Sequence, residues 1–220
     1  AYAAGRRAGQ GKKAGRRGEI GLAGLLVGTL AFACFFVYDL NQLHQNLRCL
    51  RWLFAAGCTL LAGATAWLLF SGRVLFSPPP FWSALAWAVC AVFLFLLVYT
   101  LFFALPFGKT YIKGDSRRVC DTGVYALCRH PGFLWLAGAY LFAFLACGRA
   151  GMLCAFVLFT IYNFCYVAVQ DRRVFPRLFD GYHFYRDTTP FVIPNTASVR
   201  RCLRTLRGGA DSSCGGGEPD

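Results

Sequence analysis

Residues 131–170 read PGFLWLAGAYLFAFLACGRAGMLCAFVLFTIYNFCYVAVQ, and this stretch decides the fold. It holds two apolar runs, residues 132–147 and 152–170, joined by the tight turn Gly148-Arg149-Ala150-Gly151. Neither run alternates polar and apolar residues as a strand of a membrane barrel does, so each predicts a helix. Because the connection is short, we expect a helical hairpin whose two outer ends lie close together.

Three further apolar runs precede this hairpin, at residues 20–39, 52–70 and 81–105. Runs of about 20 apolar residues are typical of transmembrane helices. The sequence therefore predicts an all-α polytopic membrane protein with about five transmembrane helices. Behind the hairpin, residues 171–186 combine arginines with aromatic residues, which predicts an amphipathic segment at the membrane interface. Pro176 should divide that segment into two short pieces.

The composition supports a membrane protein over a soluble domain. Hydrophobic residues make up 57% of the 220 residues and charged residues only 15%, whereas a soluble domain carries about 25% charged residues. The net charge of +13 raises the possibility of a nucleic-acid partner. Most Lys and Arg residues, however, flank the apolar runs, as they do in the cytoplasmic loops of membrane proteins, so no nucleic-acid partner is expected.

The cysteines and histidines predict neither a disulfide framework nor a metal site. The eleven cysteines form an odd set without a Cys-x-x-Cys pair. Several of them lie in or beside apolar runs, where cysteine acts as a small hydrophobic residue, so we expect reduced thiols. The three histidines (His44, His130 and His183) are scattered, and no ligand spacing appears.

Four parts follow from this pattern: a flexible basic tail (1–19), three transmembrane helices (20–106), a functional half with the hairpin (107–194) and a disordered tail (195–220). The positive-inside rule places the functional half at the cytosolic face, although the basic N-terminal tail then lies on the opposite side. Gly24 and Gly28 form a small-residue face that allows close helix contact and leaves self-association open.

The triplet Arg129-His130-Pro131 opens the fourth helix. Proline suits the first turn of a helix, and the free backbone N–H groups there carry partial positive charge. With the donors of Arg129 and His130, this turn predicts a receptor for a carboxylate or phosphate. Gly123 and Gly132 would let a ligand approach the backbone closely, and Tyr125 offers a flat ring. Taken alone, the triplet also fits an ordinary basic loop with a helix-starting proline.

A second block of polar residues begins where the fifth helix ends. Gln170 and Asp171 stand at that end, so the hairpin should bring them near Arg129 and His130. Tyr182 and Tyr185 are three residues apart and should share one helical face. An interfacial aromatic belt would explain the tyrosines equally well, but it would not explain the neighbouring amide and acid.

The two blocks, TGVYALCRHPGFLW at 122–135 and QDRRVFPRLFDGYHFYRDTTPFVIP at 170–194, resemble the catalytic half of the isoprenylcysteine carboxyl methyltransferase and phospholipid methyltransferase families. The resemblance covers about residues 105–194. It implies an integral membrane enzyme that uses S-adenosylmethionine and methylates a membrane lipid or a lipidated acceptor.

The resemblance also implies roles for individual residues. The cofactor would contact Arg117, Arg118, Val119, Cys120, Gly123, Tyr125, His130, Pro131, Gly132, Phe133 and Gln170. Arg129, His130 and Asp171 would form the catalytic set, and Tyr166, Tyr182 and Tyr185 would face the substrate. The chain departs from the family pattern where Gln170 replaces a Glu, Tyr166 an Arg and Phe179 a Gly.

Two other interpretations remain open. Membrane sterol reductases, which use NADPH, have a similar Arg-His-Pro triplet that is typically followed by Asn-Tyr, whereas here Gly132-Phe133-Leu134-Trp135 follows. A non-catalytic membrane scaffold of the same fold is favoured by Gln170 and Tyr166. The sequence does not identify the methyl acceptor or the oligomeric state.

Overall fold

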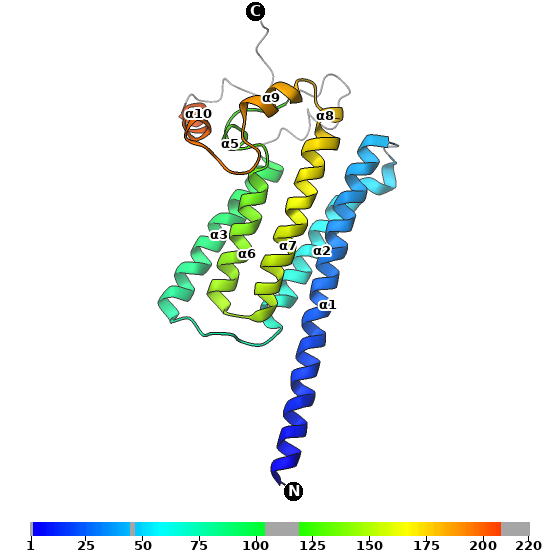
Figure 1. The fold of residues 1–220 in the computed structure, drawn as a ribbon, viewed down its shortest axis with the longest axis vertical. Coiled ribbons are helices and arrows are strands. Elements are labelled where there is room, and N and C mark those ends of the chain that lie inside the picture. Colours follow the sequence, from blue (N-terminus) through cyan, green and yellow to red (C-terminus); the bar gives the residue numbers. More distant parts are fainter. Residues whose placement is uncertain (1, 45–46, 104–118, 208–220) are drawn as a thin grey trace, which may run out of the picture. The chain divides into compact units, whose positions relative to one another are not determined.

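The structure is a computed structural model that describes residues 2–44, 47–103 and 119–207, with side chains described from residue 21 onward. Its helices are α1 (Tyr2–His44), α2 (Leu53–Phe70), α3 (Pro80–Phe102), α5 (Val124–Leu127), α6 (Pro131–Cys147), α7 (Ala150–Val169), α8 (Phe175–Leu178), α9 (Tyr182–Thr188) and α10 (Thr196–Arg207) (Figure 1). A 3-10 helix, η1 (Arg48–Trp52), precedes α2, and a π-helical turn, η2 (Gln170–Val174), continues α7.

The predicted all-α polytopic membrane fold is confirmed. Four helical segments are long and apolar enough to cross a membrane: Gly21–His44, Arg48–Phe70, Pro80–Phe102 and Ala150–Leu178. A fifth apolar helix, α6, has 17 residues and is shorter than a typical span of about 20. An isolated antiparallel bridge joins Val74 and Arg149.

The first helix is longer at both ends than the sequence predicted. It begins at Tyr2 and ends at His44, so residues 2–19, expected to form a flexible tail, are helical. Alanine, arginine, lysine and glutamine are good helix formers, and an existing helix extends at low cost because its nucleus has already formed. The hairpin matches its prediction closely, since α6 begins at Pro131 and α7 at Ala150.

The chain divides into two compact units, and each spans parts of several helices. Unit 1 comprises Ala1–Cys90 and Ala139–Asn163. In it, α1 packs along α2, and the predicted small-residue face of α1 is covered from within the chain. A side chain at Gly24 would meet Leu68 at 2.9 Å, and one at Gly28 would collide with the Phe159 ring. These glycines therefore serve close packing inside unit 1.

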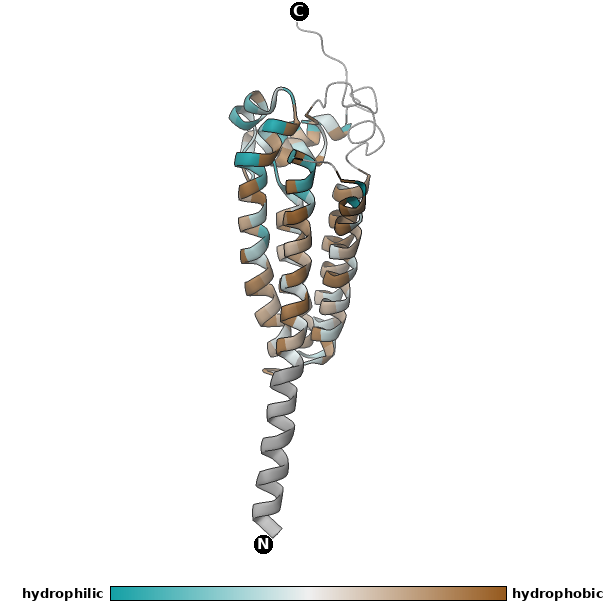
Figure 2. Cartoon of the chain, turned by 90° about the vertical axis from the view of Figure 1, so that its right-hand side faces the viewer, coloured by the Kyte–Doolittle hydropathy of each residue, from teal (hydrophilic) through white to brown (hydrophobic). Residues whose placement is uncertain are grey.

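Unit 2 comprises Ala91–Gly138 and Phe164–Asp220 and contains all the residues that form the candidate site. Aromatic pairs join its apolar helix segments, with ring centroids 6.1 Å apart for Phe93 and Trp135 and 5.9 Å apart for Phe133 and Phe164. Trp135 Nε1 also donates to Thr100 Oγ1 at 3.1 Å. Hydrophilic residues in unit 2 gather on the short elements α8, α9 and α10 (Figure 2).

The interfacial segment breaks at a different place from the one predicted. Pro176 lies in the first turn of α8, where its missing N–H is tolerated. The chain instead leaves the helix at Phe179 and re-enters it after Gly181, whose φ of 75° lies in the left-handed region that glycine favours. Pro176 therefore lies within a continuous helical segment, directly behind the π-helical turn η2, and Gly181 makes the break.

The predicted disordered tail, residues 195–220, is wrong for its first part, because α10 covers Thr196–Arg207. Asn195 and Ser198 cap this helix reciprocally. Ser198 N–H donates to Asn195 Oδ1 at 2.8 Å, and Asn195 N–H donates to Ser198 Oγ at 3.0 Å. Such a reciprocal cap satisfies two backbone donors at a helix start, and the sequence interpretation overlooked it. Residues 208–220 lie outside the described residues.

Candidate functional site

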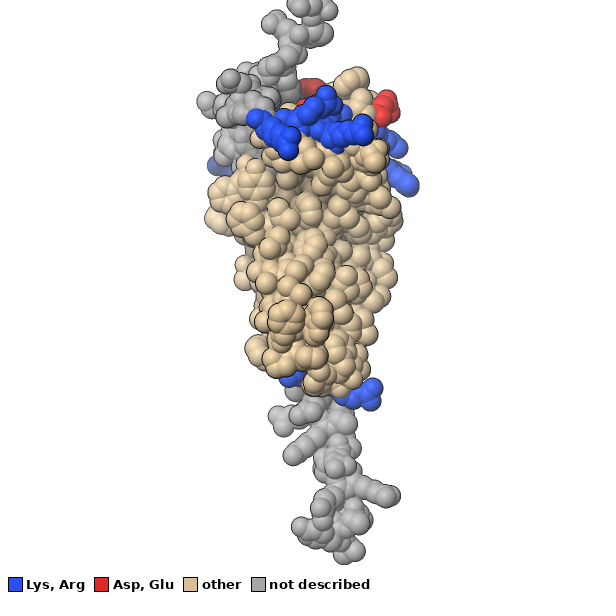
Figure 3. All heavy atoms as spheres, turned by 90° about the vertical axis from the view of Figure 1, so that its left-hand side faces the viewer, with Lys and Arg blue, Asp and Glu red and all other residues tan. Residues whose placement is uncertain are grey.

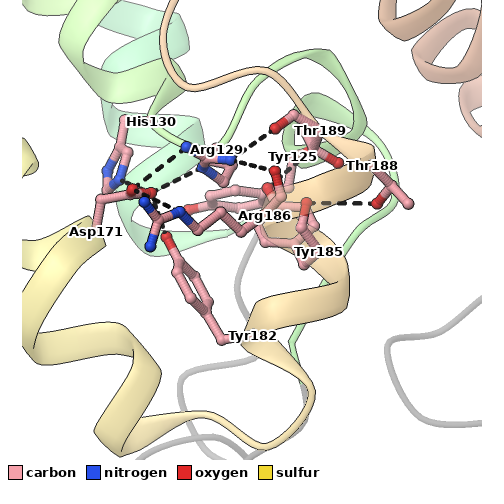
Figure 4. A network of polar contacts seen from close by, with 9 residues as sticks. All are labelled: Tyr125, Arg129, His130, Asp171, Tyr182, Tyr185, Arg186, Thr188 and Thr189. Atoms are coloured by element: carbon pink, nitrogen blue, oxygen red, sulfur yellow. Dashed lines mark hydrogen bonds and ion pairs between the residues drawn. The ribbon is translucent and has the colours of Figure 1, made fainter.

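The site begins at the turn before α6. The backbone N–H of Arg129 donates to the carbonyl of Pro190 at 2.9 Å, and that of His130 donates to the carbonyl of Phe191 at 3.2 Å. The extended segment behind α9 therefore runs beside the start of α6 and fixes its entry (Figure 4). Pro131 is fully buried at the first helical position.

Asp171 meets this turn from η2, as the hairpin predicted. Its carboxylate is 4% exposed, and its Oδ1 lies 2.7 Å from Arg129 Nε and 3.4 Å from His130 Nε2. Arg129 Nη2 donates to Oδ2 at 3.3 Å, and the Tyr182 hydroxyl donates to Oδ1 at 2.7 Å. The carboxylate sits on a π-helical turn, a form that often marks functional positions in helices.

Arg129 connects three segments of unit 2. Besides its ion pair with Asp171, its Nη1 donates to the carbonyl of Arg186 at 2.5 Å and to that of Thr189 at 2.9 Å. The guanidinium carbon lies 5.6 Å from the centre of the Phe191 ring. A buried charge is tolerated only when it is paired and hydrogen-bonded. Arg129 therefore holds α9 and η2 against the start of α6.

His130 lies in an aromatic setting and is 6% exposed. Its ring stacks on Phe175 with centroids 5.5 Å apart, and Phe191 meets it edge-on at 5.3 Å. Burial lowers the pKa of His130, an effect that Asp171 opposes and Arg129 reinforces. The imidazole is therefore neutral at neutral pH and can accept a proton.

Two buried nitrogens of the site lack a hydrogen-bond partner, namely Arg129 Nε and His130 Nε2. Both lie within ion-pair distance of Asp171, at 2.7 and 3.4 Å. These two contacts with the carboxylate are therefore electrostatic. Buried polar atoms without a hydrogen-bond partner are uncommon in proteins.

Tyr182 and Tyr185 are both buried and share one face of α9, as their spacing predicted. Tyr185 donates its hydroxyl to the carbonyl of Tyr125 at 2.8 Å, and Tyr125 donates to the carbonyl of Thr100 at 3.0 Å. Burial raises the pKa of both α9 tyrosines. They therefore remain phenols that donate hydrogen bonds inside the protein.

The two glycines of the first block differ in what the fold requires. Gly123 caps α5 with a φ of 58°, and its N–H donates to Thr205 Oγ1 at 3.0 Å, so its backbone conformation needs glycine. Gly132 has no such constraint. A side-chain carbon there would meet only Leu97 Cδ1 at 3.8 Å, an ordinary contact. Packing therefore does not explain the glycine at position 132.

The remaining predicted site residues lie around this network. Gln170, half-buried, is the first residue of η2, and half-buried Tyr166 lies one turn earlier on α7. Phe133 faces Phe164 and is half-buried. Val119 is half-buried and Cys120 buried, whereas Arg117 and Arg118 lie outside the described residues.

The six cysteines of the apolar runs that were expected to be reduced, Cys34, Cys58, Cys90, Cys147, Cys154 and Cys165, are all free. Cys49, Cys128 and Cys202 are also free, whereas Cys120, which lies outside those runs, is disulfide-bonded. Among the residues that the structure describes, no group of three or more His, Cys, Asp or Glu side chains could hold a metal ion.

Three residues that support the site were not predicted from the sequence. Thr189 is 2% exposed, and Arg201 from α10 donates to its Oγ1 at 2.5 Å. Arg186 lies 3.9 Å from Asp171 Oδ2. A proline after Thr189 favours an extended backbone at that position and no more, and nothing in the local sequence links Arg201 to the site.

Comparisons with known proteins identify no family: no family model, no curated protein and no solved structure matches this chain. The fold and the site therefore define a structural class of protein and not a family. The chain is a multi-pass helical membrane protein with a buried Arg-His-Asp-Tyr network between the start of one apolar helix and the end of another.

Proposed function

We propose that this protein is an S-adenosylmethionine-dependent methyltransferase that acts on a membrane lipid or lipidated acceptor at the cytosolic membrane face. The observation that carries the proposal is the shared network of Arg129, His130 and Asp171, with Nε–Oδ1 and Nε2–Oδ1 distances of 2.7 and 3.4 Å. This network unites the two sequence blocks on which the resemblance to membrane methyltransferases rests.

Several features of the site fit such a cofactor. The carboxylate of S-adenosylmethionine is an anion, and the amino end of α6 carries partial positive charge. His130 Nε2 is buried without a hydrogen-bond partner, and Gly132 leaves room beside the backbone. Gln170, next to Asp171, can accept a bond from an amine or hydroxyl. Arg117 and Arg118 lie outside the described residues and add nothing to this test.

In methyl transfer, the protein contributes mainly by positioning the two reactants and by excluding water from the site. When bound, S-adenosylmethionine would supply a methyl group on a sulfonium centre; an acceptor atom would attack that methyl carbon in line, and the electron pair of the broken C–S bond would leave with S-adenosylhomocysteine. Arg129 and Asp171 fix the turn that would hold the cofactor. Holding the cofactor in one orientation would favour the reaction, because a well-oriented reactant loses less entropy on the way to the transition state. A carboxylate or thiolate acceptor needs no base. For an amine acceptor, neutral His130 or Asp171 would be the candidate base that takes the proton.

The direct test is calorimetric titration of the detergent-purified protein with S-adenosylmethionine, followed by incubation with labelled cofactor and total lipid extract. We expect saturable binding and transfer of label to a lipid species. Gly132→Ala should weaken binding without unfolding the protein. Gly63→Ala is the matched control, since a side chain there meets nothing within 4 Å. Absence of binding to the folded protein would refute the proposal.

A non-catalytic scaffold is the second candidate, and a specific observation favours it. Arg129 Nη1 already donates twice to protein carbonyls, and Asp171 accepts from Tyr182 as well as from Arg129. The network thus stabilises the fold without any ligand. The scaffold predicts that the folded protein binds neither S-adenosylmethionine nor NADPH. Stabilisation by NADPH alone would instead support the reductase.

A further inference from the structure

The helix α10 has a surface that the proposed function does not use. Its sequence is TASVRRCLRTLR, and residues at spacings of three and four lie on the same side of a helix. Three sides can be distinguished by burial and chemistry. One packs inward, one carries exposed apolar side chains, and one carries exposed arginines.

The inward side fixes α10 to the rest of unit 2. Ser198 and Cys202 are buried on it. Arg201 donates to Thr189 Oγ1 at 2.5 Å, and Thr205 Oγ1 accepts the N–H of Gly123 at 3.0 Å. Because these contacts lock the rotation of the helix, the other two sides face away from the protein in a defined orientation.

The second side is an apolar stripe that nothing in the described residues covers. Val199, Leu203 and Leu206 follow one another at spacings of four and three, and they are 38%, 50% and 55% exposed. Moving leucine side chains out of water lowers the free energy of the system. A continuous exposed stripe of apolar side chains therefore marks a contact surface.

The third side is a row of arginines directly beside this stripe. Arg200, Arg204 and Arg207 recur at the same spacings and are exposed. None of them forms an ion pair with an acidic residue among those the structure describes. Figure 3, which looks onto this side of unit 2, shows the basic side chains gathered there.

We propose that α10 binds an anionic membrane surface, with Leu203 and Leu206 entering the boundary of the acyl chains and Arg200, Arg204 and Arg207 contacting lipid phosphates. A leucine stripe flanked by arginines is the pattern of helices that lie in the plane of a membrane interface. Nucleic acid would match the arginines but leave the stripe exposed. Because the chain has helices that cross a membrane, a lipid surface is available as a partner for α10.

This inference is independent of methyl transfer, because α10 would bind headgroups whatever unit 2 catalyses. It predicts a dependence on lipid charge. One basic residue near an anionic surface strengthens binding by about fivefold, so removing three should abolish the preference for anionic lipid. Salt should weaken the interaction, since exposed charges are screened beyond about 8 Å at physiological ionic strength.

The test uses the full chain in nanodiscs of phosphatidylcholine alone or mixed with phosphatidylglycerol. Amide hydrogen exchange of α10 should slow in the anionic discs. The triple variant R200Q/R204Q/R207Q should lose this difference, while R172Q/R173Q/R177Q, which removes three other exposed arginines, should keep it. Equal exchange of wild-type α10 in both discs would overturn the proposal.

A second measurement reports the depth of the stripe. Tryptophan fluorescence of Leu203→Trp should be quenched by lipids with brominated chains, after subtraction of the five native tryptophans. Ala197→Trp is the control, because Ala197 is exposed and lies three positions before Arg200, on the arginine side of the helix and outside the apolar stripe. Equal quenching at both positions would contradict insertion of the stripe. Quenching at Leu203 without a preference for anionic lipid would contradict the role of the arginines.

Discussion

Asp171 Oδ1 lies 2.7 Å from Arg129 Nε, although 42 positions of sequence separate the two residues. Their side chains are 5% and 9% exposed. A buried ion pair often contributes no more to protein stability than a well-packed apolar pair does. Removal of one partner, however, leaves the other charge buried without compensation, which destabilises the fold. The pair therefore makes the end of α7 and the start of α6 depend on each other.

Asp171→Asn should destabilise the protein strongly. It leaves the Arg129 guanidinium buried without its counter-charge, which costs about 3–5 kcal/mol. Thermal unfolding in detergent should show a large fall in the midpoint. Asp187→Asn, a change at an exposed acid, should shift the midpoint little.

A double-mutant cycle separates the ion pair from local packing. Replacing both residues, in Arg129→Met/Asp171→Leu, should cost less than the sum of the two single changes, because no charge is left stranded. Additive effects would show that Arg129 and Asp171 do not depend on each other energetically.

The two tyrosines of α9 should differ in their contribution to stability. Tyr182 donates to the Asp171 carboxylate at 2.7 Å, whereas Tyr185 donates to the neutral carbonyl of Tyr125 at 2.8 Å. Hydrogen bonds to charged groups contribute about 1.5–3 kcal/mol and neutral ones about 1 kcal/mol. Tyr182→Phe should therefore lower the free energy of unfolding more than Tyr185→Phe, as measured by denaturant titration. Equal losses would contradict the assigned partners.

The sequence predicted the elements that rest on long, regular patterns. The hairpin of α6 and α7 followed from two apolar runs and a short glycine-containing turn. That geometry alone was enough to bring Asp171 to Arg129. The shared buried face of Tyr182 and Tyr185 followed from helical spacing in the same way.

Features that depend on tertiary contacts could not be predicted. Arg201 reaches Thr189 only because α10 is ordered and packs beside α5. Asn195 and Ser198 have the spacing of a reciprocal cap, a local pattern that the prediction of a disordered tail did not take into account. The π-helical turn at Gln170–Val174 leaves no pattern in the sequence, since its extra residue per turn is a response to packing.

Acid should destabilise the protein through His130. Burial lowers its pKa in the folded state, so the unfolded chain binds a proton at a higher pH than the folded chain. Stability is therefore fully present above the ordinary histidine value of 6.5 and declines as the pH falls through it. The unfolding midpoint should drop between pH 7.5 and about 5.5, a window that brackets the pKa of free histidine.

The matched variants for this pH effect are His130→Gln and His183→Gln, since His183 is exposed. His130→Gln should flatten the pH dependence of the midpoint, whatever it does to the midpoint itself. His183→Gln should leave the slope as it is in the wild type. A slope that survives His130→Gln would assign the acid sensitivity to another group.

Two glycines of α6 offer a way to separate folding from ligand binding. A side chain at Gly138 would lie 2.7 Å from the Phe93 ring, whereas one at Gly132 would meet only Leu97 at 3.8 Å. Overpacking costs about 1–3 kcal/mol, so Gly138→Ala should lower the unfolding midpoint. Gly132→Ala should leave it unchanged or raise it slightly, because alanine favours a helix more than glycine does. If Gly132→Ala nevertheless loses S-adenosylmethionine binding in calorimetry, position 132 is kept small for a ligand. Full binding by this variant would show that the ligand approaches the network from another side.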